Sequence, residues 1–233
     1  MPHLRRPMLG LLVAMAAVVL AGCTGGGSDT ANLPSGSSLL ASSGAAMRSV
    51  TSVHFTIDVN GTLAGVPIQN ADGDLNAQGA AKGSAKVSEF GAFVEVNFVL
   101  LNGTFYVRGP TGGYQKIPAA LAGNLFDPTA ILDPDRGVAK VLTSVQGATT
   151  KDRESVNGTD CYKITGKVAR DVVAALVPGI NANVGATVWV AAGGKHLPVK
   201  AEFAVPGNGG SQGAKVDVSI SKVNEPVTVT APV

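Results

Sequence analysis

The sequence has few of the residues that build most catalytic and metal centres. Its 233 residues include two cysteines, three histidines and one tryptophan. His3 lies in an N-terminal segment that we interpret below as a signal peptide, so the mature chain keeps only His54 and His196. Zinc sites draw on several Cys and His ligands, and a disulfide framework needs paired cysteines. We therefore expect no metal site, no disulfide framework and no cofactor.

An excess of charge is also lacking. Arg5 and Arg6 precede residue 23, whereas no acidic residue does, so the rest of the chain has 16 basic and 16 acidic residues. No cluster of Lys and Arg occurs, and nucleic-acid binders carry such a cluster. We therefore expect no nucleic-acid partner. Apolar residues make up 45% of the chain, which is enough for a sizeable core and excludes global disorder.

Motifs of common enzymes are absent from the sequence. There is no Gly-x-Ser-x-Gly elbow and no Walker A loop, so acyl hydrolysis and nucleotide binding have no anchor. Asp127, Asp133 and Asp135 lack the spacing of a calcium loop and are expected to form turns and helix caps. His54 and His196 are expected to be solvated. We predict that the protein is not an enzyme.

The first 23 residues have the pattern of a bacterial lipoprotein signal. Arg5 and Arg6 form the positive region, and an apolar run from Met8 to Leu20 follows them. Leu20-Ala21-Gly22-Cys23 resembles the lipobox, which implies cleavage before Cys23 and acylation of its thiol with diacylglycerol, with further acyl chains such as palmitate. Two or three acyl chains hold a protein stably on a bilayer. We expect an anchor at Cys23 on the outer, extracytoplasmic face of the cell membrane.

The remaining chain divides into a tether and one domain. With residues 1–22 removed, residues 23–36 are small, polar and rich in Gly and Ser, which is typical of a flexible linker. Residues 37–233 are expected to form a single domain. With Cys23 acylated, Cys161 has no partner, and its strand-like surroundings favour a small buried side chain.

Alternation of apolar and polar residues predicts β-strands over much of this domain. The clearest runs are Val53–Val59, Ala85–Ser88, Val94–Leu100, Phe105–Val107, Val199–Val205 and Val216–Ile220. No helical period interrupts residues 53–108, so an antiparallel meander is expected there. Asn-Gly-Thr at Asn60, Asn102 and Asn157 favours hairpin turns.

Three helices are expected beside this sheet. Ser37 or Ser38 can cap the first, which continues to about Ser49; the second covers 137–145 after Asp133 or Asp135, and the third covers 169–176. Together these patterns predict an α+β fold, with a long antiparallel sheet and helices on one of its faces.

The run from Asp127 to Ala139, DPTAILDPDRGVA, resembles a segment of the mycobacterial LppX/LprA/LprF/LprG family of cell-envelope lipoproteins. Weaker matches in the same order include residues 59–61, 73–75, 164–168 and 186–190. Residues 37–233 are similar to this family, most of all to its LprG-like members. The resemblance implies a strongly curved antiparallel half-barrel, helices over its concave face and an apolar cavity between them.

The resemblance also implies a function. Members of the family bind acylated cell-envelope lipids and lipoglycans, of the phosphatidylinositol mannoside, lipoarabinomannan or triacylglyceride type, and several work beside a lipid-exporting transporter. We therefore expect lipid binding and transport across the envelope. The expected cavity lining consists of apolar strand residues and of residues that close the cavity over them: Phe55, Ile57, Val59, Ala85, Val87, Val96, Phe98, Leu100, Phe105, Leu121, Phe126, Ile131, Val138 and Leu142.

Two alternatives remain open from the sequence. The same apolar residues can pack a solid core, in which case the protein would be a non-catalytic scaffold that binds other envelope proteins through an exposed apolar patch. A shift of one residue in the strand pattern would also exchange the inner and outer faces of a strand.

Overall fold

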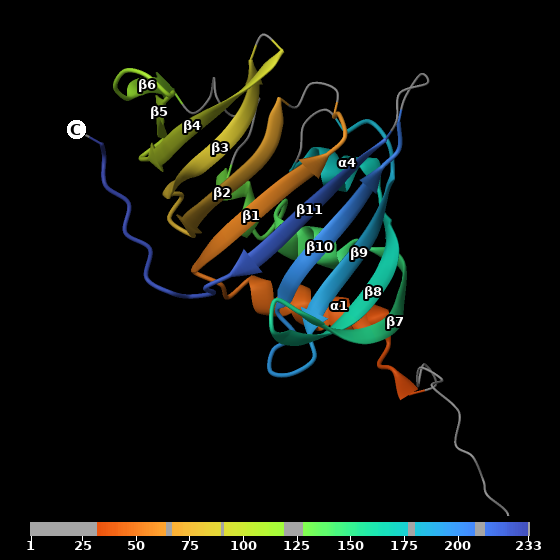
Figure 1. Ribbon diagram of the computed structural model, residues 1–233. Coiled ribbons are helices and arrows are strands. Elements are labelled where there is room, and N and C mark those ends of the chain that lie inside the picture. Colours follow the sequence, from red (N-terminus) through yellow and green to blue (C-terminus); the bar gives the residue numbers. More distant parts are fainter. Residues whose placement is uncertain are drawn as a thin grey trace, which may run out of the picture.

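One antiparallel sheet of 11 strands dominates the computed structural model (Figure 1). The structure describes residues 32–63, 67–89, 91–118, 128–176, 180–207 and 213–232. Cys23, Leu121 and Phe126, which the sequence singles out, lie outside these ranges. The strands are β1 Ser52–Asn60, β2 Ile68–Asn76, β3 Ala81–Glu89, β4 Ala92–Leu101, β5 Thr104–Arg108, β6 Gln115–Pro118, β7 Gln146–Val156, β8 Thr159–Val168, β9 Val184–Ala191, β10 Pro198–Val205 and β11 Ala214–Ser221.

The sheet consists of two meanders that meet in the middle. Strands β1 to β6 follow one another in space, as do β7 to β11, and the pairing of β1 with β11 joins the two halves. The expected meander over residues 53–108 is confirmed, and it continues into β6. Strands β6 and β7 form the two edges, so the sheet is curved but not closed into a barrel. The fold is the predicted α+β half-barrel.

Within the described residues, four short helical segments lie on the concave side of the sheet, mainly behind β1 and β7 to β11 (Figure 1). They are α1 Gly36–Met47, the 3₁₀ helix η2 Pro128–Leu132, α3 Val138–Thr143 and α4 Arg170–Ala174. Helix α1 packs against α3, β7 and β9, while η2 contacts β2. Close packing of α1 on α3 depends on Gly44, because a Cβ there would lie 2.6 Å from Cγ2 of Thr143.

The three predicted helices are present, but their starts differ from the expectation. Ser35 is the N-cap of α1 rather than Ser37 or Ser38, and its hydroxyl makes no capping bond. Gly137 precedes α3, so neither Asp133 nor Asp135 caps it. Asp133 instead closes the turn before it, where its Oδ1 accepts hydrogen bonds from the amides of Asp135 at 2.9 Å and Arg136 at 3.1 Å. A carboxylate that stabilises a turn in this way supports the non-calcium interpretation.

Two of the three Asn-Gly pairs form the predicted hairpin turns. Asn102 and Asn157 have φ of 50° and 51°, and the glycine after each also has a positive φ, as a type I′ turn requires. Asn60 ends β1 and is followed by a longer connection to β2, so the prediction of a tight turn is wrong there. Asparagine-glycine is compatible with other loops, and the local pattern does not fix loop length.

Gly73 on β2 and Gly83 on β3 face each other directly in the ladder. A Cβ on Gly83 would lie 2.1 Å from the carbonyl oxygen of Asp72, and one on Gly73 would lie 2.5 Å from that of Lys82. The two strands therefore approach and bend here in a way that no other residue type permits. Phe55 and Phe98 flank this glycine pair in the same row across the sheet.

Candidate functional site

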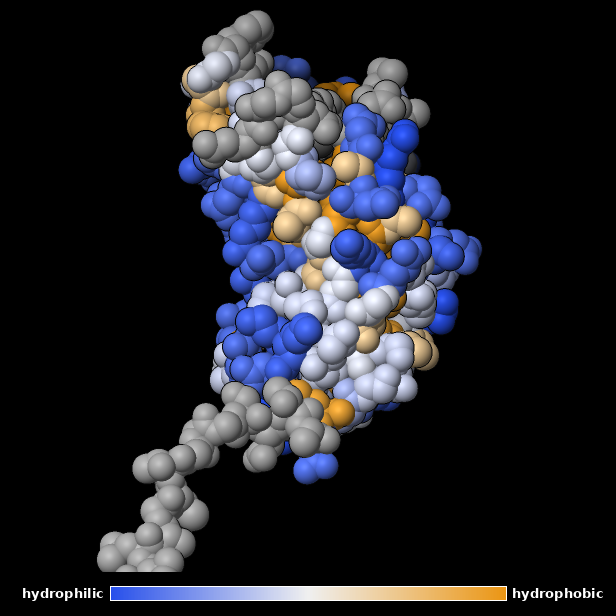
Figure 2. Space-filling model, turned by 90° about the vertical axis from the view of Figure 1, so that its right-hand side faces the viewer, coloured by the Kyte–Doolittle hydropathy of each residue, from blue (hydrophilic) through white to orange (hydrophobic). Residues whose placement is uncertain are grey.

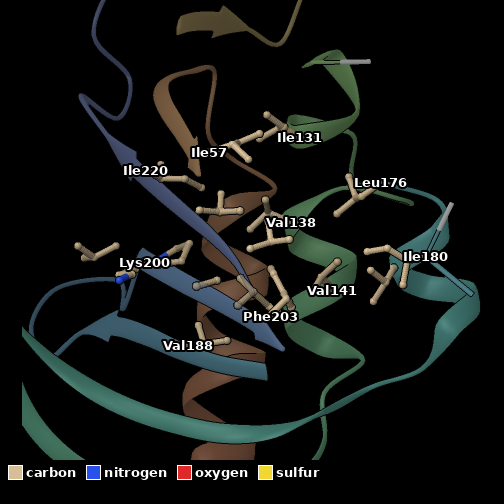
Figure 3. Close-up of a pocket in the computed structure, with 17 residues that line it drawn as sticks. Ile57, Ile131, Val138, Val141, Leu176, Ile180, Val188, Lys200, Phe203 and Ile220 are labelled. Carbon is tan, nitrogen blue, oxygen red and sulfur yellow. The ribbon is translucent and has the colours of Figure 1, made fainter. Parts of the chain in front are cut away.

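An apolar cavity lies between the sheet and the helical layer (Figure 3). Strands β1, β9, β10 and β11 form one wall, and η2, α3, α4 and Ile180 form the other. All lining side chains except that of Lys200 are aliphatic or aromatic. The lining consists of Ile57, Ile131, Val138, Val141, Leu142, Val173, Leu176, Ile180, Val188, Pro198, Val199, Lys200, Ala201, Phe203, Val216, Val218 and Ile220. Such a wall offers burial of apolar surface and no group for chemistry.

Lys200 is the exception among the lining residues, yet its charge is held away from the cavity. Its Nζ lies 2.8 Å from Oδ1 of Asp217 and 5.3 Å from the ring centroid of Trp189. Trp189 belongs to the outer face, because its neighbour Val188 faces the cavity and adjacent residues of a strand point to opposite sides. The cavity interior is therefore uncharged.

The interior space of the cavity is small. Its empty volume is about 980 Å³ when the open mouth is included, but a water molecule's centre fits into only about 100 Å³ of it. The second value is the one that compares with other binding sites, and it is below the roughly 300–1,000 Å³ of small-molecule sites. In the described conformation the walls are close together, so a bulky apolar guest requires them to separate.

One row of paired residues across the sheet contains alanines and valines, whose small side chains leave room for the cavity. Ile57 pairs with Ala71 on one side and with Val218 on the other, and the row continues to Ala201 and Val188. Residues paired in a ladder share a face. The alternating apolar positions of both meanders therefore point to the same concave side.

The structure divides the predicted lining residues into groups. Ile57, Ile131, Val138 and Leu142 line the cavity. A second group lies on the same concave side, in or against the core beside the cavity: Phe55, Ala85, Val87, Val96, Phe98, Leu100 and Phe105. Val59 packs against the smaller core around α4. Leu121 and Phe126 lie outside the described residues.

The sequence interpretation missed the part of the sheet wall that β10 and β11 form. Ala201, Phe203, Val216, Val218 and Ile220 were visible as alternating strands, but nothing local indicates that β11 pairs with β1. That pairing brings β10 and β11 opposite α3. Leu176 and Ile180 were missed for a similar reason, because a short helix does not reveal which partner it packs on.

The outer face of the sheet is polar and is built around Trp189, which is only 7% exposed. The amino groups of Lys163 and Lys200 lie 5.4 and 5.3 Å from its ring centroid, and its Nε1 donates a hydrogen bond of 2.5 Å to Oε1 of Glu154. This bond from Trp189, aided by Lys163, holds the pKa of the Glu154 carboxyl below its ordinary value of 4.5. The structure places the tryptophan in sheet packing, as the sequence predicts, and away from the cavity mouth.

Trp189 provides an optical test of this arrangement, since it is the chain's one tryptophan. Because the folded-state pKa of Glu154 is lowered, the bond stabilises the fold above pH 4.5 and is lost as the pH falls through the folded value. We expect the emission of Trp189 to change in that acidic range while circular dichroism still shows a folded protein. In Glu154→Gln, which cannot titrate, the change should disappear; its persistence there would contradict the assignment.

His54 is less free than predicted. Its Nδ1 lies 2.8 Å from Oδ1 of Asp74, and its Nε2 lies 3.2 Å from Oδ2 of Asp72. The ring is 21% exposed and lies between two carboxylates on the outer face, so the prediction of a solvated histidine is wrong. Cys161 is fully buried, as predicted, and burial raises the pKa of its thiol, which makes it a poor nucleophile.

The face on the right-hand side of Figure 1 combines hydrophilic residues with a smaller apolar area near its upper middle (Figure 2). Among the described residues, Phe93 is the large apolar side chain with high exposure, at 58%. Within the same ranges, no group of three or more His, Cys, Asp or Glu side chains is arranged to hold a metal ion. Nor is any described helix long and apolar enough to cross a bilayer.

Known proteins with similar sequences are carriers of a lipoglycan by name. The chain is 31% identical over 238 residues to the "Lipoarabinomannan carrier protein LprG" of Mycobacterium leprae, which covers 99% of this chain and 98% of that protein. It is 37% identical over 224 residues to the protein of the same name in Mycolicibacterium hassiacum, covering 93% of each.

Solved structures with the same fold include two mycobacterial lipoproteins. LprF of Mycobacterium bovis superposes with a TM-score of 0.73 at 26% identity, over 84% of this chain and 96% of LprF. LppX of Mycobacterium tuberculosis superposes with a TM-score of 0.63 at 27% identity, over 83% of this chain and 98% of LppX. The sequence profile of the LppX_LprAFG lipoproteins matches residues 35–229. The chain therefore belongs to the LppX_LprAFG lipoprotein family.

Proposed function

We propose that this protein carries acylated lipids or lipoglycans across the cell envelope by enclosing their acyl chains in the cavity between the sheet and helices α3 and α4. The observation that carries the proposal is the apolar interior of that cavity, since the one charged lining residue, Lys200, holds its ammonium group on Asp217. Similar proteins named as lipoarabinomannan carriers support a ligand that combines a glycan with acyl chains.

The energetics favour a closed apolar site for this task. Burial of an acyl chain contributes about 0.8 kcal/mol per methylene. A 16-carbon chain therefore costs on the order of 12 kcal/mol to expose to water. A carrier has to replace the bilayer with an equally apolar surface, and it needs no catalytic group to do so. The proposed role is binding and transfer without catalysis.

The small interior of the cavity indicates how it would load. Helices α3 and α4 have six and five residues, and they form much of the wall opposite the sheet. Short helices are held mainly by tertiary packing, so this wall can move more easily than the 11-stranded sheet. We propose that α3 and α4 move outward when a chain enters and close behind it.

Attachment to the membrane completes the proposal. Acylation of Cys23 would place the domain at the outer face of the cell membrane, where it could take a lipid from the bilayer or from an exporting transporter. Residues 24–31 separate the anchor from the first described residue, Asn32. Nine residue steps from Cys23 to Asn32 reach at most about 32 Å when extended, which keeps the domain near the bilayer surface.

Native mass spectrometry tests the proposal directly. A soluble form that begins at residue 24 would be secreted by a mycobacterial host, purified and analysed intact and after lipid extraction. We expect bound lipid with two or more acyl chains, which the delipidated protein takes up again on incubation. A clean apo mass with no uptake would contradict the carrier and favour the protein-binding scaffold.

A further inference from the structure

A polar hollow lies on the outer face of the sheet, opposite to the side that holds the apolar cavity. It is about 340 Å³ in volume and is formed by β4, β5 and the start of the β5–β6 connection: Glu95, Asn97, Arg108, Gly109, Pro110 and Gly112. Asn97 pairs with Arg108 across the ladder, and Phe98, next to Asn97, packs in the concave core. The hollow and the cavity are therefore separated by the sheet.

The polar groups of this hollow have unused hydrogen-bonding capacity. Among the described residues, the side chains of Glu95, Asn97 and Arg108 make no hydrogen bond or ion pair with one another or with the rest of the protein. The guanidinium carbon of Arg108 lies 5.0 Å from the ring centroid of Tyr114. Stacking of this kind fixes a guanidinium in orientation and leaves its edge N–H groups free to donate.

Glycine gives a ligand access to the backbone beside these groups. Cβ atoms built on Gly109 and Gly112 would meet nothing within 4 Å, and the φ of Gly112 is +88°. A ligand can therefore come close to the main chain at both positions. The floor offers a carboxylate as acceptor, a guanidinium as donor and an amide as both.

The charge balance of the hollow selects among ligand classes. One guanidinium is opposed by one carboxylate, so a phosphate would meet repulsion from Glu95 as well as attraction to Arg108. No apolar side-chain pocket is present in the lining for a peptide anchor. Neighbouring hydroxyls of a sugar each donate and accept, and planar side chains with both functions match them.

We propose that this hollow binds a neutral, hydroxyl-rich sugar residue of a glycan. The inference rests on the proposed function in one respect: the carried lipid must have a glycan that extends out of the cavity and is long enough to reach the hollow. The sheet edge would then hold a portion of the glycan while the opposite face holds the acyl chains.

An NMR titration with a sugar that lacks acyl chains tests the hollow alone. The ¹⁵N-labelled chain from residue 24, which contains the whole described fold, would be titrated with an α-linked mannotriose. We expect shifts at the amides of Asn97, Arg108 and Gly112, with a Kd of about 1 mM, as suits a few hydrogen bonds. Arg108→Met should weaken binding by at least about tenfold.

Lys116→Met is the matched control. Like Arg108, Lys116 has its charged group over a tyrosine ring at this edge of the sheet, with Nζ 5.7 Å from the ring centroid of Tyr106, but it does not line the hollow. Its affinity for mannotriose should be unchanged. Absence of sugar-dependent shifts, equal loss in both variants, or tighter binding of inorganic phosphate at the same amides would each overturn the proposal. A fluorescent fatty acid serves as the separate probe of the cavity: its uptake without sugar binding refutes the hollow alone, and sugar binding without its uptake refutes the carrier alone.

Discussion

Ala201→Trp is expected to abolish uptake of a fluorescent fatty acid while leaving the protein folded. Ala201 lies in the middle of β10 and faces the cavity, where its small side chain leaves space between Val188 and Val218. An indole ring would occupy the small interior, where the centre of a water molecule has only about 100 Å³ of space. If four methylenes of the guest are displaced, about 3 kcal/mol of burial is lost, which weakens binding more than 100-fold.

Ala204→Trp provides the control on the same strand. Ala204 is exposed and belongs to the outer face, so a tryptophan there adds the same bulk without entering the cavity. Fatty-acid affinity should stay within about twofold of the unmodified protein, a difference of roughly 0.4 kcal/mol. Near-UV circular dichroism and the thermal midpoint would show whether each variant is folded. Uptake by folded Ala201→Trp equal to that of Ala204→Trp would contradict the assigned cavity.

The second large effect is expected from Gly83→Ala, which should lower the free energy of unfolding by about 3 kcal/mol or more. The added methyl group would lie 2.1 Å from the carbonyl oxygen of Asp72, a distance at which the β2–β3 ladder has to separate. Urea denaturation monitored by far-UV circular dichroism would measure the change.

Gly113→Ala is the comparison for this variant, since its Cβ would have no neighbour within 4 Å and its φ is not in the left-handed region. Its stability should change by less than about 1 kcal/mol, because the added methyl group meets no neighbour and alanine restricts the unfolded chain. Equal stability of the two variants would show that β2 and β3 are not as close as described.

Local pattern was sufficient to predict most of the N-terminal meander. Val53–Val59 alternates strictly and Val94–Phe98 does so before the apolar run Phe98–Leu100, and both segments lie in strands with the predicted face toward the core. Strand β2 was not predicted from periodicity, because Asp72, Gly73 and Asp74 interrupt its apolar positions. Strand β7 is an exposed edge with few apolar residues and was missed for the same reason.

The cavity was harder to predict because it depends on contacts between distant parts of the chain. The structure places Ile57 and Leu142 in the cavity lining, and their role in lipid binding stays a prediction. Val218 and Ile220 have the same alternating pattern, but their place opposite α3 follows only from the β1–β11 pairing. His54 illustrates a similar limit, since its two aspartate neighbours come from β2.

The pairing of β1 with β11 also determines the order in which the domain can be completed. Phe55 lies opposite Ile220, 165 residues later in the chain, and closing so long a loop carries a high entropic cost. Each meander can form from neighbouring hairpins, but the wall made of Ile57, Val216 and Val218 exists only after the last strand has docked. The cavity between the sheet and the helices is therefore complete only once the first and the last strand of the chain have paired, so any change that weakens the β1–β11 pairing also opens the cavity wall.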